Sequence, residues 1–196
     1  MINPLEIAKY FIMRAYEDGR EAEITNMKVQ KLLYYSQCLY LALNDEPLFA
    51  DEIQAWRSGP VCPPAYKFYS KFEAEQLPIP IQENMANLTS EIKHILEEVW
   101  QYFGEYDAYD LSDLTHSESP WKKARKDLPS DANSDEPILL EDMRLLGEEK
   151  LLEIEKEHPH YTSIVSYVLN TAIESKEEPE YIQQGEVNDW LKSLLD

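Results

Sequence analysis

The amino-acid sequence predicts a mainly α-helical fold. Apolar residues recur at helical spacing in several long stretches, and capping residues stand in front of those stretches. The helical period is broken around residues 48–62, which predict at most a short β-hairpin or extended segment. Only five glycines and as many as 13 tyrosines occur in the 196 residues, which is not typical of a low-complexity chain. We therefore expect a compact helical domain followed by an acidic helical C-terminal region.

The first predicted helix begins at Pro4. Asn3 is suited to cap it, Pro4 fits the first helical position, and Glu6 stands where the carboxylate of a capping box belongs. The pair Asp18–Gly19 predicts its end. Its apolar residues share one face: Leu5, Ala8, Phe11, Ile12 and Ala15.

The second predicted helix runs from a cap at Thr25 to about Asn44. Its apolar residues cover more than one stripe, and the small Ser36 allows a neighbouring element to approach closely. We therefore expect this helix at the centre of the domain. Its apolar set includes Val29, Leu32, Leu33 and Leu39, and the apolar surface is broadened by Tyr34, Tyr35 and Tyr40.

Two short segments after the second helix, residues 48–49 and 53–56, are candidates for extended structure. Residues 57–61 predict a turn, because a glycine that directly precedes a proline avoids the helical region. The pair Pro63–Pro64 then begins a third helix, which carries Tyr66 and runs to about residue 72.

The clearest helical pattern covers residues 92–103 and ends at Gly104. Two short helices are predicted within residues 110–126, the second with Ser119 as its cap and Pro120 in its first position. The apolar residues of the clearest helix are Ile92, Ile95, Leu96, Val99, Trp100 and Phe103.

The composition changes after residue 127, so we expect a domain at residues 1–127 and an acidic helical extension at 128–196, packed on it or appended to it. The extension begins with a polar loop that reaches residue 137. It contains 17 acidic and five basic side chains, a net charge of −12. Apolar periodicity predicts that it folds, through Ile164, Val168, Ile173, Val187, Trp190, Leu191, Leu194 and Leu195.

The net charge of −20 bears on the kind of partner. It disfavours binding to nucleic acid or to an anionic membrane, and it favours a basic protein partner or a role as a mimic of nucleic acid. A simpler interpretation of the charge is that it only keeps the protein soluble. Cys38 and Cys62, with no leader peptide or apolar span, indicate a reduced, cytoplasmic protein.

Reactive side chains form few groupings that suggest catalysis. Asp110, His116 and Glu118 could bind zinc, but a zinc site needs three or four ligands and this group has no second His or Cys, so we expect a hydrogen-bonded structural histidine. The segment His158–His160 could chelate a metal, yet its proline favours a helix stop. Neither cysteine has a setting that activates a thiolate, and no phosphate-binding or hydrolase motif occurs. We expect no enzyme, no metal and no cofactor.

Two longer motifs are more specific. The first joins Q-K-L-L-Y-Y at residues 30–35 to A-W-x-x-G-P-V at residues 55–61, and the second is L-T-H-x-E-x-P-W at residues 114–121. Together they resemble the Panacea domain of SocA-like and phage-associated GepA-like antitoxins, over about residues 4–127. One departure is Ser58, where the family often has an aromatic residue.

The resemblance implies an antitoxin that neutralises a co-encoded protein toxin by direct binding. It also implies an alternative, a proteolytic adaptor that delivers the toxin to a ClpXP-type AAA+ protease. An acidic DNA mimic is a third possibility, suggested by the charge. The motif residues are expected to form scaffold, and some of them to contact the partner: Gln30, Lys31, Leu32, Leu33, Tyr34, Tyr35, Trp56, Gly59, Pro60, Val61, Tyr66, Thr115, His116, Glu118, Pro120 and Trp121.

Overall fold

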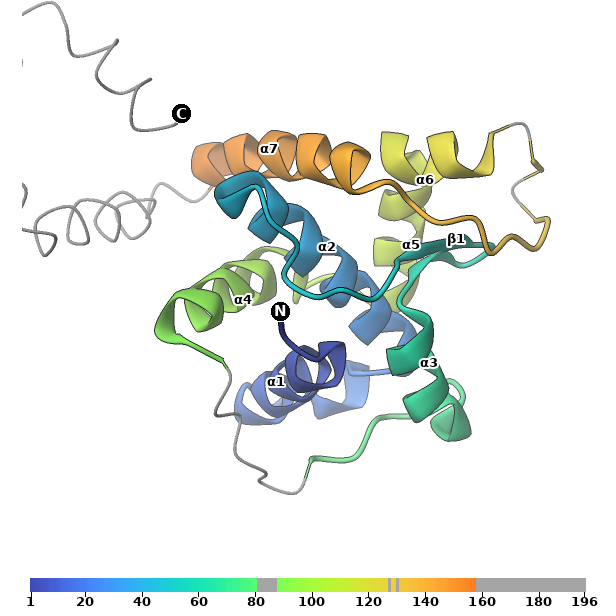
Figure 1. Ribbon diagram of the computed structural model, residues 1–196. Coiled ribbons are helices and arrows are strands. Elements are labelled where there is room, and N and C mark those ends of the chain that lie inside the picture. Colours follow the sequence, from blue (N-terminus) through green and yellow to red (C-terminus); the bar gives the residue numbers. More distant parts are fainter. Residues whose placement is uncertain (81–87, 127, 130, 158–196) are drawn as a thin grey trace, which may run out of the picture. The chain divides into compact units, whose positions relative to one another are not determined.

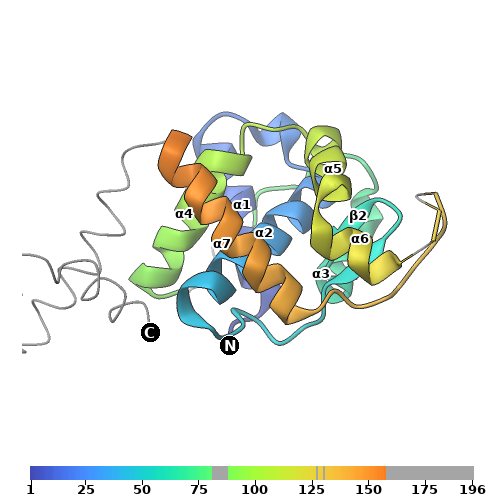
Figure 2. The same cartoon turned by 90° about the horizontal axis from the view of Figure 1, so that it is seen from above.

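Helix α2 (Asn26–Asn44) forms the centre of the fold (Figures 1 and 2). The hydroxyl of Thr25 accepts the backbone N–H of Lys28 at 3.3 Å, which is the predicted cap. Almost the whole circumference of α2 is buried from residue 26 to residue 41, as its broad apolar surface predicts. The computed structural model describes residues 1–80, 88–126, 128–129 and 131–157. The chain divides into two units, Met1–Ile154 and Glu155–Asp196, and the first of them is compact.

Helices α1 (Pro4–Glu17) and α4 (Ser90–Phe103) both pack against α2. The side chain of Asn3 accepts the N–H of Leu5 at 2.9 Å, and Thr89 caps α4 in the same manner. A short 3-10 helix, η1 (Glu21–Glu23), follows α1. The predicted and observed helices agree here, because the Asn3 cap and both apolar faces are local features of the chain, whereas the Thr89 cap was not predicted.

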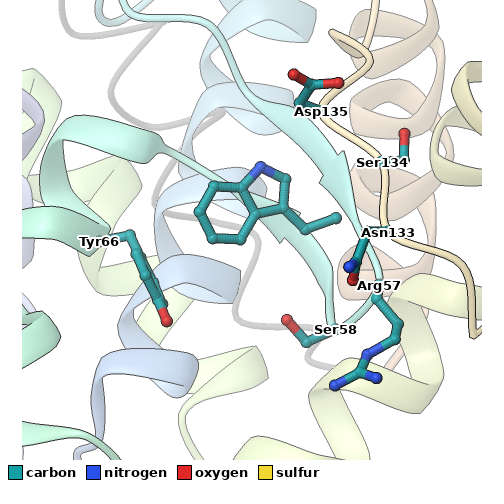
Figure 3. A pocket seen from close by; sticks show the side chains of 7 residues that line it. Arg57, Ser58, Tyr66, Asn133, Ser134 and Asp135 are labelled. Carbon is teal, nitrogen blue, oxygen red and sulfur yellow. The ribbon is translucent and has the colours of Figure 1, made fainter.

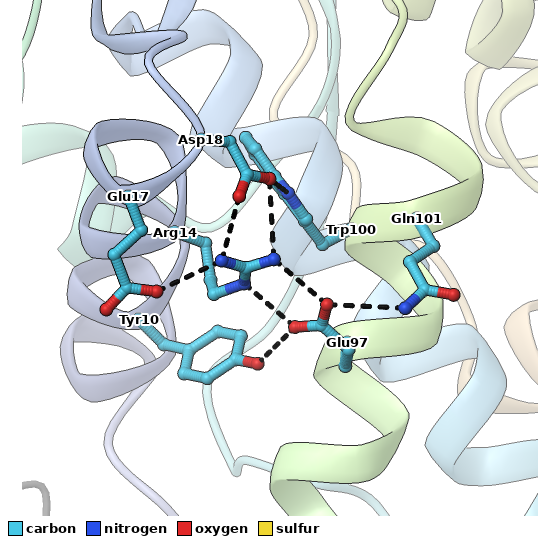
Figure 4. Close-up of polar contacts among 7 residues, drawn as sticks. All are labelled: Tyr10, Arg14, Glu17, Asp18, Glu97, Trp100 and Gln101. Carbon is cyan, nitrogen blue, oxygen red and sulfur yellow. Dashed lines mark hydrogen bonds and ion pairs between the residues drawn. The ribbon is translucent and has the colours of Figure 1, made fainter.

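A polar cluster joins α1 to α4 (Figure 4). The guanidinium of Arg14 donates to both carboxylate oxygens of Glu97, at 2.9 and 3.0 Å, and the hydroxyl of Tyr10 donates to the same carboxylate at 2.9 Å. At the end of α1, the indole of Trp100 donates to Asp18 at 2.7 Å. Because the Arg14–Glu97 pair is bidentate, it fixes the relative orientation of the two helices as well as their contact.

The strands β1 (Gln54–Trp56) and β2 (Gly59–Val61) form an antiparallel hairpin, which confirms the expected short β segment. The outer edge of β1 is covered by residues 136–138: Ala55 donates to the carbonyl of Glu136, and Ile138 donates to that of Ile53, both at 2.8 Å. Covering this edge removes its unpaired backbone groups from solvent.

Residues 48–49, the other expected extended segment, instead form bends. The side chain of Gln37 in α2 accepts the backbone N–H groups of Leu48 and Phe49, at 3.0 and 3.3 Å, and donates to the carbonyl of Phe49. A buried amide therefore satisfies the backbone groups that a neighbouring strand would otherwise pair.

Helix α3 (Pro63–Tyr69) and the 3-10 helix η2 (Ser70–Phe72) follow the hairpin, and α5 (Ala108–Ser117) and α6 (Ser119–Arg125) follow α4. The prediction that Ser119 caps α6 is wrong. Glu118 is the capping residue, because its backbone is extended while Ser119 is already helical. Pro120 still lies in the first turn, where its missing N–H has no intrahelical acceptor to lose.

Helix α7 (Leu140–Glu157) lies across α2 in both views (Figures 1 and 2). Met143, Leu146 and Ile154 are buried in the common core. Gly147 permits the crossing: a Cβ atom there would overlap the carbonyl oxygen of Cys38 and lie 2.6 Å from its carbonyl carbon. The apolar pattern expected from residue 164 onward lies outside the described residues. Within those residues, no helix is long and apolar enough to span a bilayer.

Candidate functional site

The predicted motifs meet behind the β1–β2 hairpin, around the ammonium group of Lys31. This side chain rises from α2 and donates to the carbonyl of Pro60 at 3.1 Å. Gly59 has a φ of +96°, and a Cβ atom there would lie 2.7 Å from both Lys31 Nζ and Thr115 Oγ1. Only glycine fits both the backbone conformation and the space, so the Gly-Pro-Val segment is held against α2 and α5.

Burial dominates the electrostatics of Lys31. The side chain is fully buried, and desolvation lowers the pKa of its amine from 10.5 to about 7. Within the described residues, the Lys31 side chain bonds to a carbonyl and not to a carboxylate. Lys31 is therefore a structural donor that is expensive to keep charged.

Gln30, the neighbour of Lys31, fixes the start of α3. Its side-chain carbonyl accepts the N–H of Cys62 at 3.0 Å, and its amide donates to Asn26 at 3.0 Å. Asn26 in turn donates to the carbonyl of Tyr66 at 3.1 Å. These bonds hold α3 beside the hairpin and so determine where the ring of Tyr66 lies.

The L-T-H-x-E-x-P-W motif and the rest of α5 also hold the hairpin. The indole of Trp121 donates to the carbonyl of Trp56 at 2.9 Å, and Ser112 donates to the carbonyl of Ser58 at 3.0 Å. The ring of His116 packs 4.3 Å from that of Trp121, centroid to centroid. Burial, and then the positive charge of Lys31, lower the pKa of His116, which favours the neutral imidazole.

Sequence reasoning did not single out Arg125, although it completes this support. Arg125 is buried and donates to the carbonyls of Ala55, Pro129 and Ala132, at 3.1, 2.7 and 2.6 Å. Its guanidinium also lies 4.7 Å from the ring centroid of Trp121. Arg125 lies in a run of basic residues, and only the fold reveals the carbonyls that surround it.

A second buried polar cluster joins the motif residues to α7. The hydroxyl of Tyr35 donates to Glu118 at 3.0 Å, and the ammonium of Lys150 lies 3.6 Å from the same carboxylate oxygen. Burial raises the pKa of Glu118 to about 7, although Lys150 and Tyr35 act in the opposite direction. Other motif residues are simply buried, namely Leu32, Leu33, Tyr34, Val61 and Pro120.

The candidate zinc grouping does not form. Asp110 is exposed on α5, Glu118 is buried against Tyr35, and His116 packs on Trp121. Among the described residues, no three His, Cys, Asp or Glu side chains are placed to hold a metal ion. The segment His158–His160 lies outside those residues. Cys38 and Cys62 are buried, and burial raises the pKa of both thiols, which opposes formation of a reactive thiolate.

The exposed part of the hairpin borders a hollow of about 580 Å³. We call it the hairpin hollow, and it is lined by Trp56, Arg57, Ser58, Tyr66, Asn133, Ser134 and Asp135. The rings of Trp56 and Tyr66 meet edge to face, with centroids 4.9 Å apart. Figure 3 shows Tyr66 on one side, Asn133 and Ser134 on the other, and Arg57 and Asp135 at opposite ends. Trp56 belongs to the A-W-x-x-G-P-V motif and Tyr66 is one of the candidate residues of the sequence analysis, whereas residues 133–135 were predicted only as a polar loop.

Residues 29–122 match the family model described as "Antitoxin SocA-like, Panacea domain". This stretch of the chain is similar to a Panacea domain. The matched range begins in α2, ends in α6 and contains all the motif residues around Lys31 and Glu118. Helices α1 and α7 lie outside it, although both pack into the same core as the Panacea domain. No curated protein and no solved structure matches the chain.

Proposed function

We propose that this chain is an antitoxin that neutralises a co-encoded protein toxin by direct, stoichiometric binding. The match of residues 29–122 to an antitoxin-like family carries the proposal. The use of the motif side chains supports it. Lys31, Gln30, Thr115 and Trp121 bond to the chain itself behind the hairpin, so they act as scaffold and leave partner contact to exposed residues.

The charge of the chain supports a basic toxin. Complementary potentials accelerate association and select against wrong partners. The second unit, residues 155–196, holds nine acidic and three basic side chains, a net charge of −6. We propose that this unit and the acidic side chains of α7 steer the toxin toward the Panacea domain.

Co-expression with each neighbouring reading frame tests the proposal. A neighbour that stops growth alone should permit growth beside this chain, and the two proteins should co-purify in a fixed ratio. The amount of toxin should stay constant. Toxin that disappears only when a ClpXP-type protease is present would favour the adaptor mechanism instead. Neutralisation of no neighbour would contradict the proposal.

Removal of residues 155–196 tests the electrostatic part. The cut leaves the core of the first unit intact, including Met143, Leu146 and Ile154. At low ionic strength we expect the association rate to fall about tenfold, with a smaller change in the dissociation rate. Surface plasmon resonance at several salt concentrations measures both rates. A truncated chain with the same association rate and the same salt dependence would show that the second unit does not steer the toxin.

A further inference from the structure

The turn of the β1–β2 hairpin displays side chains that the scaffold does not use. Arg57 and Ser58 are exposed at the turn, while Lys31, Thr115 and Trp121 hold the backbone on either side of it. No hydrogen bond or ion pair joins the guanidinium of Arg57 to another side chain in the described part of the chain. On a protein with a net charge of −20, an available cation at the end of a hollow that two aromatic rings line is a distinctive feature.

The residue types that line the hairpin hollow match those of a binding hot spot in a protein–protein interface. Trp, Tyr and Arg are the residue types most enriched at such hot spots, and Trp56, Tyr66 and Arg57 supply one of each. Its volume of about 580 Å³ can accept a large side chain and part of its backbone. The buried bonds behind the hairpin hold the turn in place before any partner arrives, which lowers the entropy lost on binding.

Resting on the proposed function, we propose that the hairpin hollow is the anchor site for the toxin. The occupant is a toxin segment that places an apolar or aromatic side chain against Trp56 and Tyr66. A carboxylate of the same segment pairs with Arg57, because the planar guanidinium fork matches a carboxylate in a bidentate manner. Asn133 and Ser134, on the opposite wall, are placed to bond with the backbone of that segment.

The anchor site and the acidic surface then have separate effects. Long-range charge attraction raises the rate of encounter with a basic toxin, whereas a buried aromatic and arginine centre determines how long the complex lasts. A basic toxin with one acidic residue in its binding segment satisfies both conditions.

The test uses the full-length chain and, as the probe, the purified toxin that the co-expression experiment identifies. Trp56→Ala and Arg57→Glu should each weaken binding by about 30-fold or more, mainly through faster dissociation. Matched controls are Tyr109→Ala, an exposed aromatic on α5, and Lys93→Glu, an exposed cation on α4 with the same change in charge. Both controls should bind within threefold of wild type.

Arg57→Glu keeps the proposal falsifiable if Trp56→Ala fails to fold, because Arg57 is exposed and bonds to no core residue through its side chain. If Arg57→Glu and folded Trp56→Ala both bind the toxin with nearly the affinity of the wild type, the anchor site is wrong and the proposed function still stands. A wild-type chain that binds no neighbouring product would overturn both. If Arg57→Glu instead changes the self-association of the chain in light scattering, the hollow is a contact between copies and the proposal is wrong.

Discussion

Replacement of Lys31 by methionine tests whether this motif residue serves the scaffold. Methionine has a similar length but no ionisable group, so the substitution removes the buried amine and leaves the core filled. The carbonyl of Pro60 then loses its donor, at a cost of about 1–3 kcal/mol that does not depend on pH.

The pH-dependent part of the difference in unfolding free energy between wild type and Lys31→Met follows from the burial of Lys31. Its pKa falls from 10.5 to about 7 in the folded chain. Between these two values the unfolded chain binds a proton that the folded chain does not, so this residue makes wild type more stable as the pH rises. At about 1.4 kcal/mol for each tenfold change, the full effect is about 5 kcal/mol, of which about 2 kcal/mol appears between pH 7 and pH 9.

Urea unfolding at pH 7, 8 and 9 measures this difference. The unfolding free energy of wild type minus that of Lys31→Met should rise by about 2 kcal/mol across the series. Lys93→Met, which removes an exposed lysine on α4, should show no such trend. Parallel curves for wild type and Lys31→Met would show that Lys31 stays charged in the folded protein, because such a lysine makes no pH-dependent contribution in this range.

Two further substitutions test the contacts of α7. Gly147→Ala should destabilise the chain by about 2 kcal/mol in thermal or urea unfolding, because the added Cβ meets the backbone of Cys38, although alanine favours helices. Glu148→Ala, at an exposed position, is the control. Unchanged stability of Gly147→Ala would show that α7 does not cross α2 so closely. Burial raises the pKa of the Glu118 carboxyl to about 7, so the folded chain keeps this proton at a higher pH than the unfolded chain. The unfolding free energy of wild type should therefore fall by about 3 kcal/mol as the pH rises from 4.5 to 7, and Glu118→Gln should remove this fall. An undiminished fall in the variant would show that Glu118 is not its source.

Local signals in the sequence predict much of the fold. Asn3, Thr25 and Gly104 mark helix ends at the positions where α1, α2 and α4 begin or end. The apolar pattern of residues 92–103 predicts the buried face of α4, and the broad apolar surface of α2 predicts its central position. In each case the signal and the structure it determines lie within a few residues of each other.

Contacts between distant residues could not be predicted in the same way. Tyr35 and Glu118 are 83 positions apart, and Lys31 and Pro60 are 29 apart. Their residue types indicate that they need partners but do not identify them. Gly147 weakens the helical signal of α7, because glycine is unfavourable inside a helix. The reason for a glycine at this position is apparent only beside the backbone of α2. Residues 133–135 line the hairpin hollow only because residues 136–138 pair with the chain at β1, which is another contact between distant residues.

We propose that the folded chain holds a co-encoded toxin directly, through exposed residues that a buried motif network supports. Sedimentation of the purified chain with the purified product of its toxic neighbour, with no other protein present, is the most direct measurement. We expect one faster-sedimenting species of fixed composition, and its loss when Arg57 is replaced by glutamate. Two independent boundaries for the wild-type mixture, with growth still restored in cells, would contradict the claim.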